Sequence, residues 1–157
     1  MARITPMLWF DHQAEEAARF YTSIFRNSKI GAVSRYGDSG PGPKGSVMVV
    51  AFELDGQPFT ALNGGPMFKF TEAISLVVNC ADQKEVDHYW DRLTEGGAPV
   101  QCGWLKDKYG LSWQIVPSVL SELMSGPDSA RSQRVMAALM LMVKLDIGQL
   151  QQAYEQG

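Results

Sequence analysis

The chain has 157 residues, of which 45% are hydrophobic and 20% charged, and its formal net charge is -3 at pH 7. This size and polarity are typical of one soluble domain and exclude a disordered chain, which would contain far fewer apolar residues. The apolar runs are shorter than the roughly 18 residues of a membrane span, and a mildly acidic chain has no electrostatic reason to bind nucleic acid or an anionic membrane. Two cysteines and no visible export signal favour a cytoplasmic protein without disulfides.

The first half of the chain predicts a strand, a helix and three more strands. Residues 4–10 are a short apolar run typical of a buried strand, and Asp11 is placed to cap the helix that follows. Strands are predicted over 29–36, 46–54 and 57–63, with the glycine-rich residues 37–45 and then the Asp55-Gly56 turn between them. The apolar face of the helix recurs at three- and four-residue spacing: Ala14, Ala17, Ala18, Tyr21, Ile24 and Phe25.

The same order then begins again. Residues 73–79 predict a strand, Asp82 and Glu85 have the spacing of a capping box, and Gly96 is placed to end the helix. Further strands are predicted over 100–105 and 111–116, with a turn at 107–110. We therefore predict an α+β fold of two β-α-β-β-β modules, at 4–65 and 72–117. Neither module covers its own sheet alone, so we expect both to pair into a single domain spanning 1–157.

Residues 118–157 predict a helical tail. A short helix covers 118–124, Asp128 caps a longer one, and 146–154 predict further helical turns. Methionines at 136, 140 and 142 lie among the apolar residues of this tail, which predicts packing against the sheet or against a partner subunit.

Several local strings resemble one protein family. They include Asn63-Gly-Gly-Pro66, Phe68-Lys-Phe70, Ala73-Ile-Ser75, Asp82-Gln83 and, most specifically, the run from Cys102-Gly-Trp to Val116-Pro117. With the doubled module, they resemble the vicinal oxygen chelate (glyoxalase/bleomycin-resistance) superfamily, in its PhnB-like branch often labelled 3-demethylubiquinone-9 3-methyltransferase. The resemblance implies a curved mixed sheet from each module, a pocket enclosed by both, and commonly a homodimer.

Metal-dependent members of that superfamily hold a divalent ion with side chains on the first and last strands of each module. The matching positions here are Thr5, Ala73, Asn63 and Gln114, none of which brings a charge or an imidazole. The two histidines, at positions 12 and 88, are predicted to lie on helix surfaces. We therefore expect no catalytic metal and no cofactor.

Few groups of residues in the sequence could form a catalytic site. The glycine-rich residues 37–45 join two predicted strands and predict a hairpin or pocket lid, whereas a nucleotide or S-adenosylmethionine site favours a turn between a strand and a helix. Cys102 is the best nucleophile candidate, and Lys106 or Lys108 could promote its thiolate, although a buried small hydrophobic residue is the alternative. Cys80 is predicted to be structural.

The positive evidence is for a binding cavity. Alternation places Thr5, Met7 and Trp9 on one face of the first strand, and the resemblance implies that this face lines the pocket. The same logic adds Ser75 and Gln114, with Asn63 and Trp104 at the rim. Such a wall suits a small, partly apolar organic molecule. The alternative is that these residues fill a packed core, as we expect of Trp90 and Trp113.

Three functions remain open. The first is metal-independent binding of a small organic molecule. The second is an enzyme working in the same pocket, an isomerase, lyase or transferase that includes the methyltransferase of the family label. The third is a scaffold that acts through its C-terminal helices.

Overall fold

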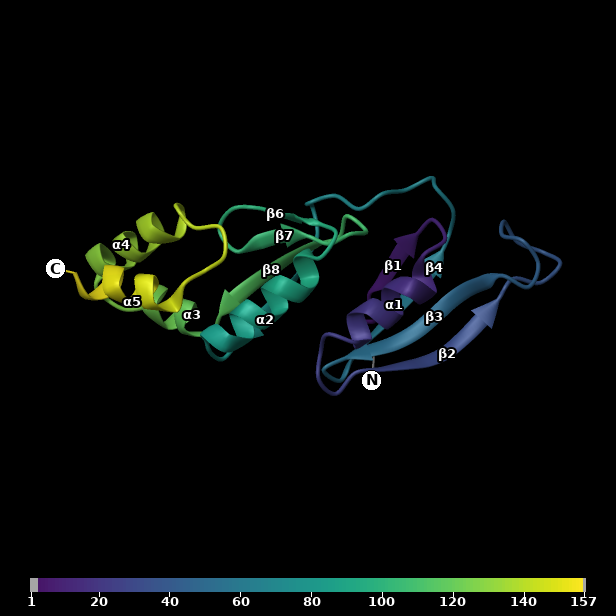
Figure 1. Cartoon of the computed structure of the whole chain (residues 1–157), viewed down its shortest axis with the longest axis horizontal. Helices are drawn as coiled ribbons and strands as arrows, with labels where there is room; N and C mark the ends of the chain where they lie inside the picture. The colour runs from purple at the N-terminus through teal and green to yellow at the C-terminus, as the bar shows by residue number, and fades with distance from the viewer. Residues whose placement is uncertain (1–2, 157) are drawn as a thin grey trace. The chain divides into compact units, whose positions relative to one another are not determined.

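Each half of the chain folds around its own four-stranded sheet (Figure 1). The computed structural model describes residues 3–156. The chain divides into two structural units, of which the first ends at Phe70 and the second begins at Thr71. The order β-α-β-β-β occurs in both units, as the sequence predicts, and three further helices follow the second sheet. The architecture is therefore α+β.

The first unit consists of five elements whose strands form a mixed sheet. In chain order they are β1 (Met7–Phe10), α1 (Ala14–Thr22), β2 (Lys29–Arg35), β3 (Val47–Leu54) and β4 (Gln57–Asn63). The sheet order is β1-β4-β3-β2, in which β1 runs parallel to β4 and the other neighbours are antiparallel.

Helix α1 covers one face of this sheet, and the core lies between them. The helix contributes alanines at positions 14, 17 and 18 that are fully buried, and such small side chains let its backbone approach the strands closely. The ring of Tyr21 stacks on Phe52 with centroids 6.3 Å apart, and Phe52 stacks on Phe59 at 5.4 Å. Leu8 faces this core, whereas its neighbour Met7 is 54% exposed on the opposite, helix-free face.

The start of α1 differs from its prediction. The first strand begins at Met7 rather than at residue 4, and Asp11 does not cap the helix. Instead Asn63, at the end of β4, accepts a hydrogen bond from the Ala14 N–H at 2.8 Å through its Oδ1. The end of β4 lies beside the start of the helix, so a residue 49 positions away provides the acceptor that local spacing assigns to Asp11.

The second unit repeats this plan. Its elements are β5 (Ser75–Cys80), α2 (Gln83–Thr94), β6 (Ala98–Pro99), β7 (Trp104–Lys106) and β8 (Ser112–Pro117), in the sheet order β5-β8-β7-β6. The predicted capping box is confirmed: Asp82 Oδ1 accepts from the Glu85 N–H at 2.9 Å, and Glu85 Oε1 accepts from the Ala81 N–H at 2.6 Å.

The predicted single strand over 100–105 is wrong. The chain turns between β6 and β7, and the Val100 N–H donates to the carbonyl of Trp104 at 2.8 Å. Cys102 and Gly103 adopt φ values of 61° and 84°, in the left-handed region that an extended strand does not use. The sequence signals for a strand are apolar side chains, and these do not reveal the change in backbone conformation.

A buried carboxylate organises the predicted turn at 107–110. Asp107 is 3% exposed, and its Oδ1 accepts from the N–H groups of Tyr109 and Leu111 at 2.9 and 3.1 Å. Its Oδ2 accepts from Trp113 Nε1 at 2.9 Å. Trp113 and Trp90 are both buried, as predicted for residues that pack between helix and sheet.

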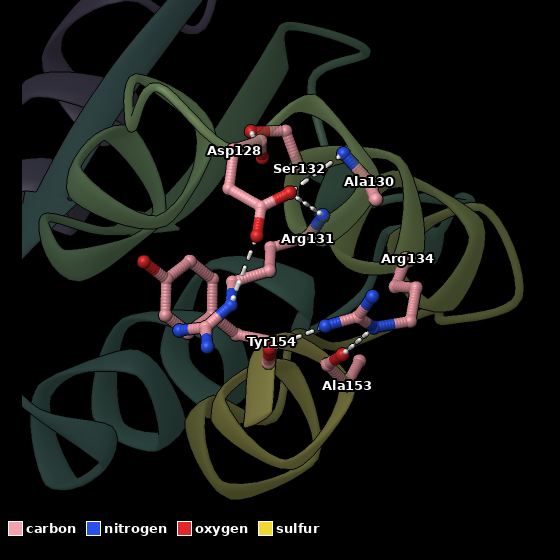
Figure 2. A network of polar contacts seen from close by, with 7 residues as sticks. All are labelled: Asp128, Ala130, Arg131, Ser132, Arg134, Ala153 and Tyr154. Atoms are coloured by element: carbon pink, nitrogen blue, oxygen red, sulfur yellow. Dashed lines mark hydrogen bonds and ion pairs between the residues drawn. The ribbon is translucent and has the colours of Figure 1, made fainter. Parts of the chain in front are cut away.

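The C-terminal helices form a cluster with a core of its own. They are α3 (Val119–Met124), α4 (Ser129–Leu139) and α5 (Ile147–Glu155). Asp128 caps α4 as predicted, and Arg134 donates to the carbonyls of Ala153 and Tyr154 at 2.9 and 2.8 Å (Figure 2). The α4 arginine therefore holds the C-terminal end of α5. The buried core of the cluster consists of Val135, Met142, Leu145 and Leu150.

The segment between α4 and α5 is hydrogen-bonded to the turn between β6 and β7 and to α2. The N–H groups of Cys102 and Gly103 donate to the carbonyls of Met142 and Val143, both at 2.8 Å. A Cβ at Gly103 would lie 3.0 Å from Leu145 Cγ, so the close packing of Leu145 on this turn depends on a glycine at position 103. We call residues 140–147 the tail segment.

Gln83, at the start of α2, binds two backbone groups at the C-terminal end of the tail segment. Its Nε2 donates to the carbonyl of Leu145 at 3.0 Å, and its Oε1 accepts from the Ile147 N–H at 2.8 Å. Lys144 Nζ lies 2.9 Å from Asp87 Oδ1. Hydrogen bonds from Gln83 and then Lys144 hold the pKa of the Asp87 carboxyl below its usual range, and Asp87 raises the pKa of Lys144. Within residues 3–156, every helix is too short or too polar to cross a bilayer.

Candidate functional site

The seven predicted ligand residues fall into two groups, one in each unit. Thr5, Met7, Trp9 and Asn63 belong to the first unit, and Ser75, Trp104 and Gln114 belong to the second. That residues of both groups line one pocket stays a prediction.

Trp9 lies on the helix-free face of the first sheet but is engaged by the segment after β4. Its Nε1 donates to the carbonyl of Gly65 at 2.9 Å, and its ring lies 4.9 Å from that of Phe68. A Cβ at Gly64 would lie 2.4 Å from the indole, so only glycine permits this contact. Thr5 precedes β1 and lines a shallow pocket of about 240 Å³ with residues of β2, β3 and β4.

Asn63 faces the other side of the sheet. It is in register with Phe10, and its amide binds the Ala14 N–H and donates to the carbonyl of Val47 at 3.1 Å. The structure therefore does not bring Asn63 together with Met7 and Trp9. It places the amide at the start of α1.

Ser75, Trp104 and Gln114 do come together in the second unit. Gln114 is in register with Trp104 on one side and with Val77 on the other, and its Nε2 donates to Ser75 Oγ at 2.9 Å. Val77 is 50% exposed. Alternation along β8 places Ser112 on the same face, and its buried Oγ has no hydrogen-bond partner among the described residues. We call this surface, which lies opposite α2, the open face of the second sheet.

The positions that match a metal site do not fit a divalent cation. Asn63 Oδ1 already accepts from a helix N–H, and the Gln114 amide is paired with Ser75. Thr5 and Ala73 bring neither charge nor imidazole. Among residues 3–156, no three His, Cys, Asp or Glu side chains are grouped closely enough to hold a metal. No step through a metal ion follows from these side chains.

The two cysteines have different surroundings. Cys102 Sγ lies 3.9 Å from the Met140 sulfur, while Lys106 pairs with Glu72 and Lys108 lies over an aromatic ring. Both lysines that could promote a Cys102 thiolate thus contact other groups. Burial raises the pKa of Cys80 to about 12, with Glu85 and Asp82 adding to the shift, so this thiol stays protonated at neutral pH.

A larger cavity lies beside one predicted ligand residue, Asn63, and the glycine-rich loop that the sequence predicts as a hairpin or pocket lid. It has a volume of about 410 Å³ and lies between the start of α1, this loop and the residues after β4. The loop joins β2 to β3, as predicted for residues 37–45. The residues from the start of α1 were not predicted as part of a site, because the walls come from segments far apart in the chain.

The architecture defines the class of protein. A doubled β-α-β-β-β unit, in which each sheet keeps one face that its helix does not cover, is the glyoxalase/bleomycin-resistance fold. The fosfomycin resistance protein FosX from Listeria monocytogenes has this fold at 16% identity and a TM-score of 0.53, over 77% of this chain and 93% of its own. A Pseudomonas aeruginosa protein is similar at 19% identity and a TM-score of 0.63, over 74% and 98%.

The family follows from closer similarity. The sequence model of the 3-demethylubiquinone-9 3-methyltransferase family matches residues 2–116, and the chain belongs to this PhnB-like family. A Bacillus cereus protein, described as a putative 3-demethylubiquinone-9 3-methyltransferase, PhnB protein, is 40% identical with a TM-score of 0.68. That similarity covers 74% of this chain and all of the Bacillus protein. None of the curated proteins compared with the chain matches it. Helices α3–α5 lie beyond the family match.

Proposed function

We propose that the chain binds a small, partly apolar organic molecule on the open face of the second sheet, without a metal ion. The observation that carries this proposal is the hydrogen bond between Gln114 and Ser75, beside the exposed Val77 and the half-buried Trp104. Apolar surface with a few fixed, neutral polar groups is the usual lining of a small-molecule site.

Ser112 lies on the same strand face and in register with Ser75, but its Oγ is buried out of reach of a ligand on the surface. The accessible polar groups of the open face are therefore those of the half-buried Ser75 and Gln114. Metal independence is supported by the donor set, because the side chains at the four matching positions are neutral and the two amides among them, Asn63 and Gln114, are already hydrogen-bonded.

An enzyme working at the same place is the second candidate. Lys106 is in register with Ser112 and pairs with Glu72, which places an ionised pair at the edge of the open face. Hydrogen bonding from Lys106 lowers the pKa of Glu72, so this carboxylate is ionised at neutral pH. The lowered pKa makes Glu72 a weak base, so its part in a reaction, including the methyl transfer of the family name, would be to balance positive charge on a substrate.

A thermal-shift screen of metabolites tests the proposal. A ligand at 100 times its Kd stabilises the folded chain by about 2.7 kcal/mol, which raises the Tm by roughly 5–10 °C for a chain of this size. We expect the shift to be lost in Gln114→Leu and reduced in Ser75→Ala. Gln151→Leu makes the same chemical change on the exposed surface of α5 and is expected to keep it.

Two results would overturn the proposal. A ligand whose shift is the same in Gln114→Leu and in the wild type binds elsewhere. A shift that vanishes with a chelator and returns with manganese, nickel or zinc would disprove metal independence. Turnover of a bound metabolite that stops in Glu72→Gln while binding persists would favour the enzyme.

A further inference from the structure

The cavity at the start of α1 lies entirely within the first unit and differs from the open face of the second sheet. Its volume of about 410 Å³ is within the usual range for small-molecule sites. We call it the α1 pocket. Nothing in the proposed function uses it, and its side chains differ in charge from those of the open face.

Hydrogen bonds hold the walls of the α1 pocket in place. Asn63 links the helix to the strands, because its amide accepts from Ala14 and donates to Val47. The Tyr36 hydroxyl donates to the carbonyl of Asn63 at 2.5 Å. A Cβ at Gly42 would lie 2.2 Å from the Tyr36 ring, so the loop folds over the ring only because glycine stands there. These contacts form without a ligand.

The two sides of the pocket differ in chemistry. The side formed by the loop and β3 is largely apolar, whereas the helix side carries two carboxylates, Asp11 and Glu15, with His12 between them. The apolar side consists of Tyr36, Pro41, Pro43 and Val47.

The two carboxylates make the pocket favour a positively charged ligand over a negatively charged one. Their ion pairs are long and exposed: Asp11 lies 3.6 Å from His12, and Glu15 lies 3.6 Å from Arg19. Exposed pairs of this kind are worth about 0–1 kcal/mol, so they leave the carboxylates free to bind another cation. The helix N-terminus adds only about half a positive charge, which is less than the two negative charges. An anion would therefore be repelled.

We propose that the α1 pocket binds a small organic ammonium ion with an aromatic or branched apolar body. The ammonium group lies against Asp11 and Glu15, and the apolar body packs against Val47 and the loop prolines. The buried Tyr36 ring lies beneath the loop and supports this wall.

Three probes with the same ring test the sign of the charge: tryptamine, the neutral alcohol tryptophol, and indole-3-propionate. Calorimetry at neutral pH is expected to give the tightest binding for tryptamine, about fivefold tighter than tryptophol. The carboxylate should bind weakest. Amide shifts in an NMR titration should change at residues 11–15 and 41–47.

Matched variants test the location. Asp11→Asn combined with Glu15→Gln is expected to bring tryptamine down to the affinity of tryptophol without changing tryptophol binding. Glu16→Gln removes one charge from the same helix turn but lies outside the pocket lining, and it should bind tryptamine as the wild type does.

Four outcomes would overturn the proposal: equal binding of the amine and the alcohol, tighter binding of the carboxylate, an equal loss in Glu16→Gln, or tryptamine binding weaker than about 10 mM. NMR shifts confined to Ser75 and Gln114 would place the amine on the open face and would also overturn it. None of these results bears on the proposed function unless the shifts fall on that face.

Discussion

Replacement of Asp107 by alanine should lower the free energy of unfolding more than replacement of any exposed charged residue in the chain. The change removes the acceptor for three donors: two N–H groups of the turn and the indole of Trp113. The Tyr109 N–H is only partly buried and can bind water, whereas the Leu111 N–H and the Trp113 Nε1 would be left buried. Each buried N–H group without a hydrogen-bond partner costs about 1–3 kcal/mol, so we expect the two groups together to lower the free energy of unfolding by about 4 kcal/mol.

Urea unfolding followed by tryptophan fluorescence measures this loss, with the transition of the second unit fitted separately. Asp128→Ala is the matched control, because it removes an exposed helix cap and should cost about 1 kcal/mol. Asp107→Asn keeps the oxygen that accepts from the N–H groups of the turn. It places an NH2 group against the indole N–H, where two donors face each other, so its loss of stability should lie between those of Asp107→Ala and Asp128→Ala. If Asp107→Ala costs no more than Asp128→Ala, the reasoning from buried hydrogen bonds is refuted.

Three further predictions concern the tail segment and the thiols. Gln83→Ala removes two hydrogen bonds to the tail segment and should speed hydrogen exchange in α5, with a loss of about 1–2 kcal/mol; unchanged exchange would contradict the contact. Lys144→Met should be less stable than the wild type near neutral pH. The difference should fade as the pH falls below about 3.8, where Asp87 with its lowered pKa becomes protonated, and as the pH rises above about 10.5, where Lys144 with its raised pKa loses its proton. An aromatic disulfide reagent near pH 8 should label Cys102 quickly and Cys80 slowly, because burial keeps the Cys80 thiol protonated; equal rates would disprove this.

Local signals predicted most of the fold. The capping box at Asp82 and the cap at Asp128 depend on residues a few positions apart, and the structure confirms both. The cap of α1 comes from Asn63, far along the chain, so spacing assigned it to Asp11 instead. The prediction of a strand over 100–105 was wrong for a different reason: the identity of residue 102 as cysteine does not indicate that its backbone is left-handed.

The grouping of Ser75 with Gln114 was predictable from the family resemblance combined with strand alternation. The resemblance placed both side chains on the expected pocket face, and the parallel register of β5 and β8 brings them into hydrogen-bond contact. That they bind a ligand stays a prediction. The α1 pocket as a whole has no such basis. Its walls are assembled by tertiary contacts such as the Tyr36–Asn63 hydrogen bond, which joins residues 27 positions apart.

The tail segment has a consequence for any shortened form of this chain. The N–H groups of Cys102 and Gly103 now donate to Met142 and Val143. A protein ending near Pro117, where the family match stops, would present both donors unpaired, together with the apolar surface beneath Leu145. Main-chain donors that lose their partners bind water or a second molecule instead. We therefore expect such a fragment to be less stable and to self-associate more readily than the full chain.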